Sequence, residues 1–255
     1  INSVKPNLII SDSRGAWFRA TILFILALIG TVGMWSVVVF IPDIEKEFGL
    51  DRGTSSLLYA FTMIGFGFGT VIIGKFYDKF GIKKPILLAT FVLITSYYFY
   101  SIFPFYWQFL ILQFFMGFAA SAFFGPAMAD ISNFFNKQRG FALSIVASAN
   151  YVAGATWPLL IGYFLTFIDW RAAHFWISIC LFIMIPLILL LKNASVDESK
   201  SHDMKQRYKD IRLDLSNNQI QVLLMLAGIC CCVAMAMPQV HMVALCVDNG
   251  FGLQV

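Results

Sequence analysis

The stretch that decides the fold is GKFYDKFGIKK, residues 74–84, which lies between two long apolar segments. Each of these segments has the roughly 20 apolar residues that a helix needs to cross a bilayer. The four lysines favour a cytoplasmic position, because cytoplasmic loops of membrane proteins are enriched in Lys and Arg. Gly81 allows a sharp turn into the next segment. The stretch therefore predicts two membrane-spanning helices joined by a short charged loop.

The only acid of this loop, Asp78, falls at the C-terminal end of the preceding apolar helix. The helix dipole disfavours a carboxylate there by a few tenths of a kcal/mol up to about 1 kcal/mol. We therefore expect Asp78 to have cationic partners, and Lys79, Lys83 and Lys84 are close in sequence.

Composition extends this interpretation to the whole chain. Hydrophobic residues make up 59% of the 255 residues and charged residues 13%, whereas a soluble domain carries about a quarter charged residues. We therefore predict an all-α, multi-pass transmembrane helical bundle. Its seven spans are 17–41, 54–75, 85–104, 107–131, 141–166, 172–191 and 220–247.

The basic residues predict the orientation. With a cytoplasmic N-terminus, 15 of the 18 basic residues lie in the cytoplasm, including Arg14 and Arg19 in the N-terminal tail. Only Lys46, Arg52 and Arg171 then face the other side. This bias predicts a multi-pass protein of the plasma (inner) membrane with its N-terminus in the cytoplasm. The same bias accounts for the net charge of +4, so we expect the lipid bilayer as partner and no nucleic acid.

Four regions follow from these spans. We predict a cytoplasmic tail at 1–16, a six-helix transmembrane bundle at 17–191, a cytoplasmic linker at 192–219 and the first helix of a second bundle at 220–255. The chain begins with Ile and ends soon after the seventh span, so we expect a fragment of a longer protein. A shift of 87 residues aligns Arg52 with Arg139 and Gly67 with Gly154, which favours inverted three-helix repeats within the bundle.

Small residues recur at four-residue intervals in two spans, at Gly65 and Gly69 and at Gly117 and Ser121. In lipid, such stripes allow helix backbones to approach closely. Close packing is sufficient to explain them, and the alternative is a smooth surface along which helices slide.

Polar residues inside spans are costly and therefore tend to be functional. An interhelical hydrogen bond is the alternative role for each of them. Together they predict a neutral, aromatic-lined cavity for a small-molecule substrate, with these candidates for its lining: Trp35, Tyr59, Asn150, Tyr151, Gln239 and His241.

The sequence shows no pattern typical of an enzyme. The histidines are in separate regions, and the five cysteines lie in apolar spans without metal-site spacing. A glycine-rich phosphate loop followed by Lys and Ser or Thr is also missing from the sequence. We therefore expect no catalytic activity, no cofactor and no metal site.

Several motifs resemble the major facilitator superfamily. They are the spacing of Gly74, Asp78, Gly81 and the lysine pair, FFNKQRGFA at 134–142, DWR at 169–171 and MPQVHMVA at 237–244. The last three are similar to monocarboxylate-transporter-like and oxalate/formate-antiporter-like members. The resemblance implies a twelve-helix carrier, of which this chain is the first seven helices.

The implied function is secondary active or facilitative transport of a small organic solute, such as a monocarboxylate, by alternating access. A coupling proton or ion is a further expected partner, although Gln113 stands where the superfamily commonly has an arginine linked to proton coupling. The alternatives are a membrane receptor, sensor or scaffold on the same fold. The implied cytoplasmic gate comprises Gly74, Asp78, Lys79, Gly81, Lys83, Lys84, Asp130 and Arg139.

Overall fold

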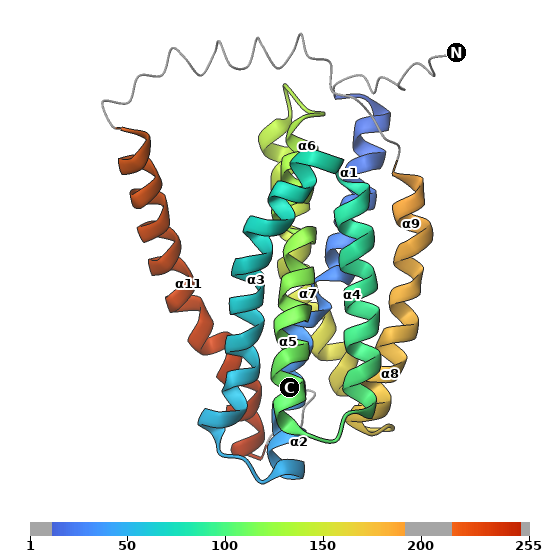
Figure 1. Cartoon of the computed structure of the whole chain (residues 1–255), viewed down its shortest axis with the longest axis vertical. Coiled ribbons are helices and arrows are strands. Elements are labelled where there is room, and N and C mark those ends of the chain that lie inside the picture. The colour runs from blue at the N-terminus through green and yellow to red at the C-terminus, as the bar shows by residue number, and fades with distance from the viewer. Residues whose placement is uncertain (1–11, 192–215, 251–255) are drawn as a thin grey trace.

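The computed structural model describes residues 12–191 and 216–250, and these residues form helices joined by short connections (Figure 1). Within these described residues, seven helical segments are long and apolar enough to cross a membrane. The prediction of an all-α, multi-pass helical bundle is confirmed. The predicted boundaries of the tail and linker fall largely in 1–11 and 192–215, outside the described residues, so the division into four regions stays a prediction.

The first three spans contain four helices. The first span is interrupted at Thr31, which separates its two helices, whereas the second and third spans are each one helix. The bounds are α1 Arg14–Gly30, α2 Val32–Phe48, α3 Arg52–Phe80 and α4 Lys83–Ile102.

The fourth and sixth spans are also interrupted, each by a short 3₁₀ turn, and the fifth and seventh are continuous. The fourth span contains α5 Tyr106–Ala120 and α6 Gly125–Ser132, and the fifth is α7 Arg139–Phe164. The sixth contains α8 Trp170–Cys180 and α9 Met184–Leu190, and the seventh is α11 Asn217–Asp248.

The predicted extent of the charged loop, residues 74–84, is wrong. Helix α3 continues through Phe80, and only Gly81 and Ile82 separate it from α4. Residues 75–80 contain no helix breaker, so the helix extends past the apolar segment until a glycine ends it. Gly81 has φ of +72°, a left-handed conformation that favours glycine, and this confirms its predicted role in the turn.

Helices α3 and α5 make the most extensive helix contact of the bundle, and glycines make it possible. A Cβ atom added to Gly65 would lie 2.0 Å from the carbonyl oxygen of Phe114. One added to Gly117 would lie 1.9 Å from the carbonyl oxygen of Thr62. The backbones therefore touch at these glycines, and the close packing predicted from the small residues is confirmed.

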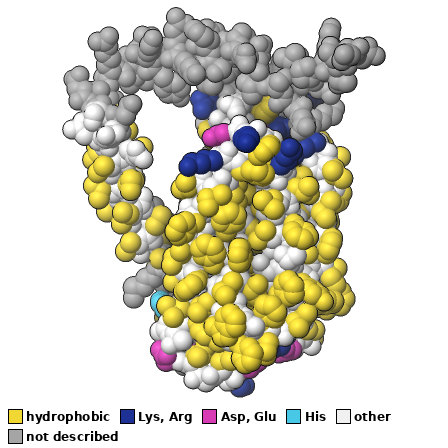
Figure 2. All heavy atoms as spheres, in the orientation of Figure 1, with side chains coloured by type: hydrophobic (Ala, Val, Ile, Leu, Met, Phe, Trp, Pro, Cys, Tyr) yellow, Lys and Arg dark blue, Asp and Glu magenta, His cyan; other side chains and the backbone are white. Residues whose placement is uncertain are grey.

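The outer surface is suited to lipid in its middle and to water at its ends. Figure 2 shows hydrophobic side chains over the visible face of the bundle and charged side chains gathered at its two ends. Within 12–191, Lys46, Arg52 and Arg171 lie at the end of the bundle opposite the start of α1, and the other basic residues lie at the end where α1 begins. This is the distribution on which the predicted orientation depends.

Helix α11 runs along one side of the bundle rather than joining its core. It packs against α2, and it diverges from the bundle toward its own N-terminal end (Figure 1). The space between α11 and the first six spans is where the candidate site lies.

Candidate functional site

A cavity of about 470 Å³ lies between the bundle and α11. Its lining comes from α2, α3, α7 and α11 together with Thr31 and Phe124, which occupy the interruptions of the first and fourth spans. Five aromatic side chains contribute to its walls: Trp35, Tyr59, Phe66, Phe124 and Tyr151. A volume of this size is within the range of small-molecule sites.

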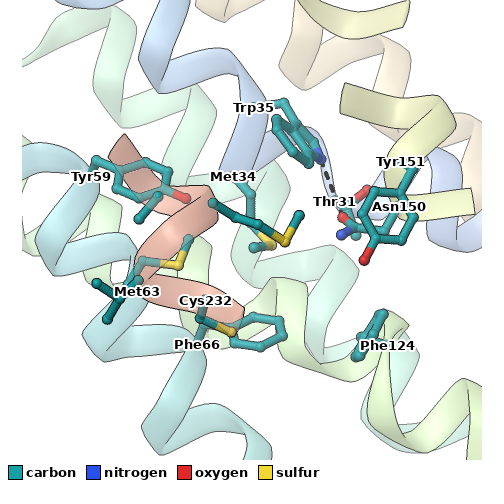
Figure 3. A pocket seen from close by; sticks show the side chains of 13 residues that line it. Thr31, Met34, Trp35, Tyr59, Met63, Phe66, Phe124, Asn150, Tyr151 and Cys232 are labelled. Atoms are coloured by element: carbon teal, nitrogen blue, oxygen red, sulfur yellow. Dashed lines mark hydrogen bonds between the residues drawn. The ribbon is translucent and has the colours of Figure 1, made fainter. Parts of the chain in front are cut away.

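The remaining lining is mostly apolar. Four sulfur-bearing side chains line the cavity, namely Met34, Met63, Cys232 and Met235. Thr31 and Asn150 are the two polar non-aromatic side chains, and none of the described lining residues is charged. The lining can therefore surround an apolar or aromatic molecule and offers a few groups for hydrogen bonding (Figure 3).

Trp35 and Asn150 are joined across the cavity wall. The indole Nε1–H of Trp35 donates to Oδ1 of Asn150 at 3.2 Å (Figure 3). The indole ring packs against Gly154, where an added Cβ would lie 2.8 Å from a ring carbon. Asn150 and Gly154 are one helical turn apart on α7, so they lie on the same face of the helix and both contact the Trp35 side chain.

The structure brings together four of the six residues predicted for the cavity: Trp35, Tyr59, Asn150 and Tyr151. Their role in binding a substrate stays a prediction. His241 is exposed on α11 and is not among the described lining residues, so its predicted position in the lining stays a prediction. The side chain of Gln239 lies outside the described residues.

The sequence-based prediction missed Met63 and Phe66, which line the cavity beside Tyr59. These three residues occupy positions i, i+4 and i+7 of α3 and therefore lie on one helix face. This periodicity was available in the sequence and could have identified them. Nothing comparable distinguishes Cys232, because the packing of α11 decides which of its residues face the cavity.

Other polar residues of the spans serve helix packing. The hydroxyl groups of Ser36 and Tyr97 lie 2.6 Å apart in a hydrogen bond between α2 and α4. Thr62 donates to Gln113 at 2.9 Å, which joins α3 to α5. For these residues the alternative of an interhelical hydrogen bond is therefore observed. Gln113 is buried in the bundle and does not line the cavity.

The predicted pairing of Asp78 with lysines is wrong. No salt bridge joins its exposed carboxylate to another described residue. Instead, the ammonium groups of Lys79 and Lys84 lie 5.3 Å and 4.6 Å from the centre of the Phe80 ring. A carboxylate at an exposed helix end is solvated by water, which removes the need for a protein partner.

A different predicted gate residue, Asp130, is paired. Its carboxylate accepts hydrogen bonds from Nε of Arg19 at 2.6 Å and from Nη2 at 2.9 Å. The two side chains are only 5% and 7% exposed, and the Arg19 guanidinium lies 4.6 Å from the centre of the Phe134 ring. Arg19 was predicted to belong to the cytoplasmic tail, and the structure corrects this by placing it inside the bundle.

The remaining predicted gate residues lie at the α3–α4 corner or at the start of α7. Arg139 is the first residue of α7, and Gly74 lies on α3 with no atom within 4 Å of a Cβ added to it. Lys83 begins α4. These residues are therefore at one end of the bundle, and their role as a gate stays a prediction.

Asp12 links the start of the described chain to the α6–α7 connection by hydrogen bonds. Its carboxylate accepts hydrogen bonds from the backbone N–H groups of Asn136, Lys137 and Gln138 at 3.2–3.3 Å. Partial burial raises the pKa of the Asp12 carboxyl, but the three N–H donors outweigh it and hold the pKa below its ordinary value.

Half-exposed ion pairs occupy the opposite end. The Arg171 guanidinium contacts Glu47 at 2.6 Å, with side-chain exposures of 25% and 39%. Glu47 also accepts a hydrogen bond from Nε1 of Trp170 at 2.8 Å. This cluster joins α2 to α8. Among the described residues, no group of three His, Cys, Asp or Glu side chains is placed to hold a metal ion.

Seven apolar spans, three of them interrupted, and a cavity between the bundle and α11 define a polytopic helical membrane protein. Residues 23–254 match the family described as "Major Facilitator Superfamily", and the chain belongs to this superfamily. The fold agrees with a structure of the inward open xylose transporter XylE from E. coli, at a TM-score of 0.60 and 11% identity over 84% of this chain and 56% of that one.

Two curated relatives are fungal. The chain is 28% identical over 151 residues to "MFS-type transporter pynF" of Aspergillus niger, across 57% of this chain and 34% of the relative. It is 27% identical over 156 residues to "Agnestins efflux protein AgnL12" of Paecilomyces divaricatus, across 59% of this chain and 35% of the relative. The chain thus spans about a third of the length of these relatives.

Proposed function

We propose that this chain contributes to a secondary transporter that moves a small organic solute across a membrane by alternating access. The observation that carries the proposal is the cavity of about 470 Å³, which is lined by both the six-span bundle and α11. A site shared by two parts of a protein changes shape when those parts move relative to each other. Membership of the superfamily and the transporter names of its relatives support the same function.

The class of solute is a finer proposal. The motif resemblance suggests a monocarboxylate, but a buried carboxylate needs a compensating cation, and no described lining residue supplies one. The aromatic and thioether walls favour a neutral organic molecule instead. A monocarboxylate remains the alternative if a cation reaches the site from outside the described residues.

The orientation and the gate are also proposals. Basic residues gather at the end of the bundle where α1 begins, which supports a cytoplasmic N-terminus in the plasma (inner) membrane. The gate would use the α3–α4 corner at this end, with Asp78 free to pair with a group on a moving partner. The ion pair of Arg19 and Asp130 would hold α1 and α6 together beside it.

The test is transport by the full-length protein in liposomes. A mixed pool of small neutral and acidic organic solutes is supplied outside, and mass spectrometry identifies those that accumulate inside. We expect Met63→Trp, which fills the cavity, to abolish the accumulation seen with the wild-type protein. Ile64→Trp is the matched control, because Ile64 is 49% exposed on the outer surface of α3 and should leave transport unchanged.

Two results would count against the proposal. Accumulation that survives in Met63→Trp at the wild-type rate would show that the solute does not pass through this cavity. Binding of a solute without any accumulation would favour the receptor or sensor alternative.

A further inference from the structure

We propose that the cavity selects neutral aromatic solutes that carry a hydrogen-bond-accepting oxygen, and that Asn150, oriented by Trp35, is the residue that recognises this oxygen. The inference rests on the proposed transport function and names the substrate class of the same site. It depends on the direction in which the Asn150 amide is held.

The position of Trp35 is determined by α7. Its six-membered ring occupies the space that a side chain at position 154 would fill, since a Cβ on Gly154 would lie 2.8–2.9 Å from three of its ring atoms. Its Nε1–H reaches Oδ1 of Asn150 at 3.2 Å. Figure 3 shows the two side chains meeting at the cavity wall.

This contact fixes which end of the amide remains available. An indole N–H can only donate a hydrogen bond, so the Asn150 atom that receives it must be the oxygen. The amide nitrogen then carries two N–H donors, and no described residue accepts a hydrogen bond from it. Asn150 is half-buried and lines the cavity, so a bound solute is the natural acceptor for these donors.

The other lining groups restrict the rest of the solute. The Thr31 hydroxyl donates to the Ala27 carbonyl of α1 at 2.8 Å and is therefore not a donor for the solute. Aromatic and thioether side chains form most of the remaining wall, and such surfaces pack well against an aromatic ring. Because the described lining has no cation, a carboxylate would lose its hydration without compensation.

Three naphthalene derivatives of nearly equal shape test this selectivity. They are 2-acetylnaphthalene, which has a neutral acceptor, 2-ethylnaphthalene, which has none, and 2-naphthoate, which is charged. Binding of each radiolabelled compound is measured with the full-length protein in nanodiscs, after subtraction of binding to empty nanodiscs. We expect the wild-type protein to bind the acetyl compound about three- to tenfold more tightly than the ethyl compound, the range of one neutral hydrogen bond. We expect it to bind 2-naphthoate more weakly than the acetyl compound.

Two variants separate recognition from structure. Trp35→Phe frees the amide to rotate, so the ratio of acetyl to ethyl affinity should fall toward one. The double variant Trp35→Phe/Asn150→Leu removes both donors without leaving an unpaired partner, so both neutral compounds should bind equally. A purely structural role for Trp35 would instead weaken both compounds alike. Thr31→Val is the matched control, because it changes a lining side chain that offers no donor, and it should keep the preference.

The proposal is overturned if the wild-type protein does not prefer the acetyl compound, if the double variant keeps the preference, or if 2-naphthoate binds most tightly. Its failure differs from failure of the transport proposal. Transport through the cavity without an acetyl preference would remove only the selectivity. The predicted binding pattern without accumulation of any solute in liposomes would leave the selectivity and remove the transport function.

Discussion

The buried ion pair between Arg19 and Asp130 makes a quantitative prediction about stability. The pair links positions 111 residues apart in sequence, through two hydrogen bonds of 2.6 Å and 2.9 Å, and its side chains are 5% and 7% exposed. Removal of one partner leaves the other charge buried and unpaired, which typically costs about 3–5 kcal/mol. We therefore expect Asp130→Ala to lower the free energy of unfolding by about this amount.

The double variant Arg19→Met/Asp130→Leu should recover most of this loss. Replacement of a buried ion pair by apolar side chains of similar volume is often neutral or stabilising, because neither charge has to be desolvated. Glu47→Gln is the matched control at the other end of the bundle. Its partner Arg171 is 25% exposed and Glu47 itself is 39% exposed, so its loss should cost no more than about 1 kcal/mol.

The assay is equilibrium unfolding of the full-length protein in mixed micelles of a mild detergent and increasing SDS. Each variant is compared with the wild-type protein by the change in the free energy of unfolding. The reasoning is refuted if Asp130→Ala costs less than the Glu47→Gln control. It is also refuted if the double variant is as unstable as the sum of its two single variants, because the two residues would then act independently.

Two further predictions concern packing and pH. Gly65→Ala should destabilise the protein by about 1–3 kcal/mol, because its Cβ would lie 2.0 Å from the Phe114 carbonyl oxygen and force α3 away from α5. Gly67→Ala, which meets no atom within 4 Å, should be neutral or stabilising in the same SDS unfolding assay, and equal effects would contradict the packing argument. The folded-state pKa of Asp12 is lowered, so its contribution is present above the ordinary value of 3.8 and is lost as the pH falls below it. Amide protection at residues 136–138 should therefore fall as the pH is lowered from 3.8 through the folded-state pKa of Asp12. Asp12→Ala should abolish this dependence, and a pH dependence that is the same in the variant would show that the Asp12 hydrogen bonds do not stabilise this connection.

The sequence by itself determined the fold class and the number of spans. Seven apolar segments of bilayer length can satisfy their backbone hydrogen bonds in lipid only as helices, so the local composition was sufficient. Glycines at helical spacing also predicted close backbone packing for these spans, although not that α3 and α5 would pack against each other. The extent of α3 was misjudged, because apolar composition marks where a helix leaves the membrane and not where it ends.

The candidate cavity was only partly predictable. Trp35, Tyr59, Asn150 and Tyr151 stood out because polar aromatic and amide groups are costly in an apolar span. Gln113 is also a polar residue inside an apolar span, although its side chain serves helix packing. Composition cannot distinguish a polar residue that lines the cavity from one that joins two helices, because either position can provide hydrogen-bond partners for the polar group.

Only the tertiary structure decided which charges pair and which groups face the cavity. The sequence placed Arg19 in the cytoplasmic tail, whereas in the structure it pairs with Asp130 of α6 inside the bundle. The sequence also predicted cationic partners for Asp78, whereas its carboxylate is exposed. The amide of Asn150 has a direction only because Trp35 donates to it from a position 115 residues away. Such contacts depend on how helices cross in space, and sequence spacing along a single helix carries no information about that crossing.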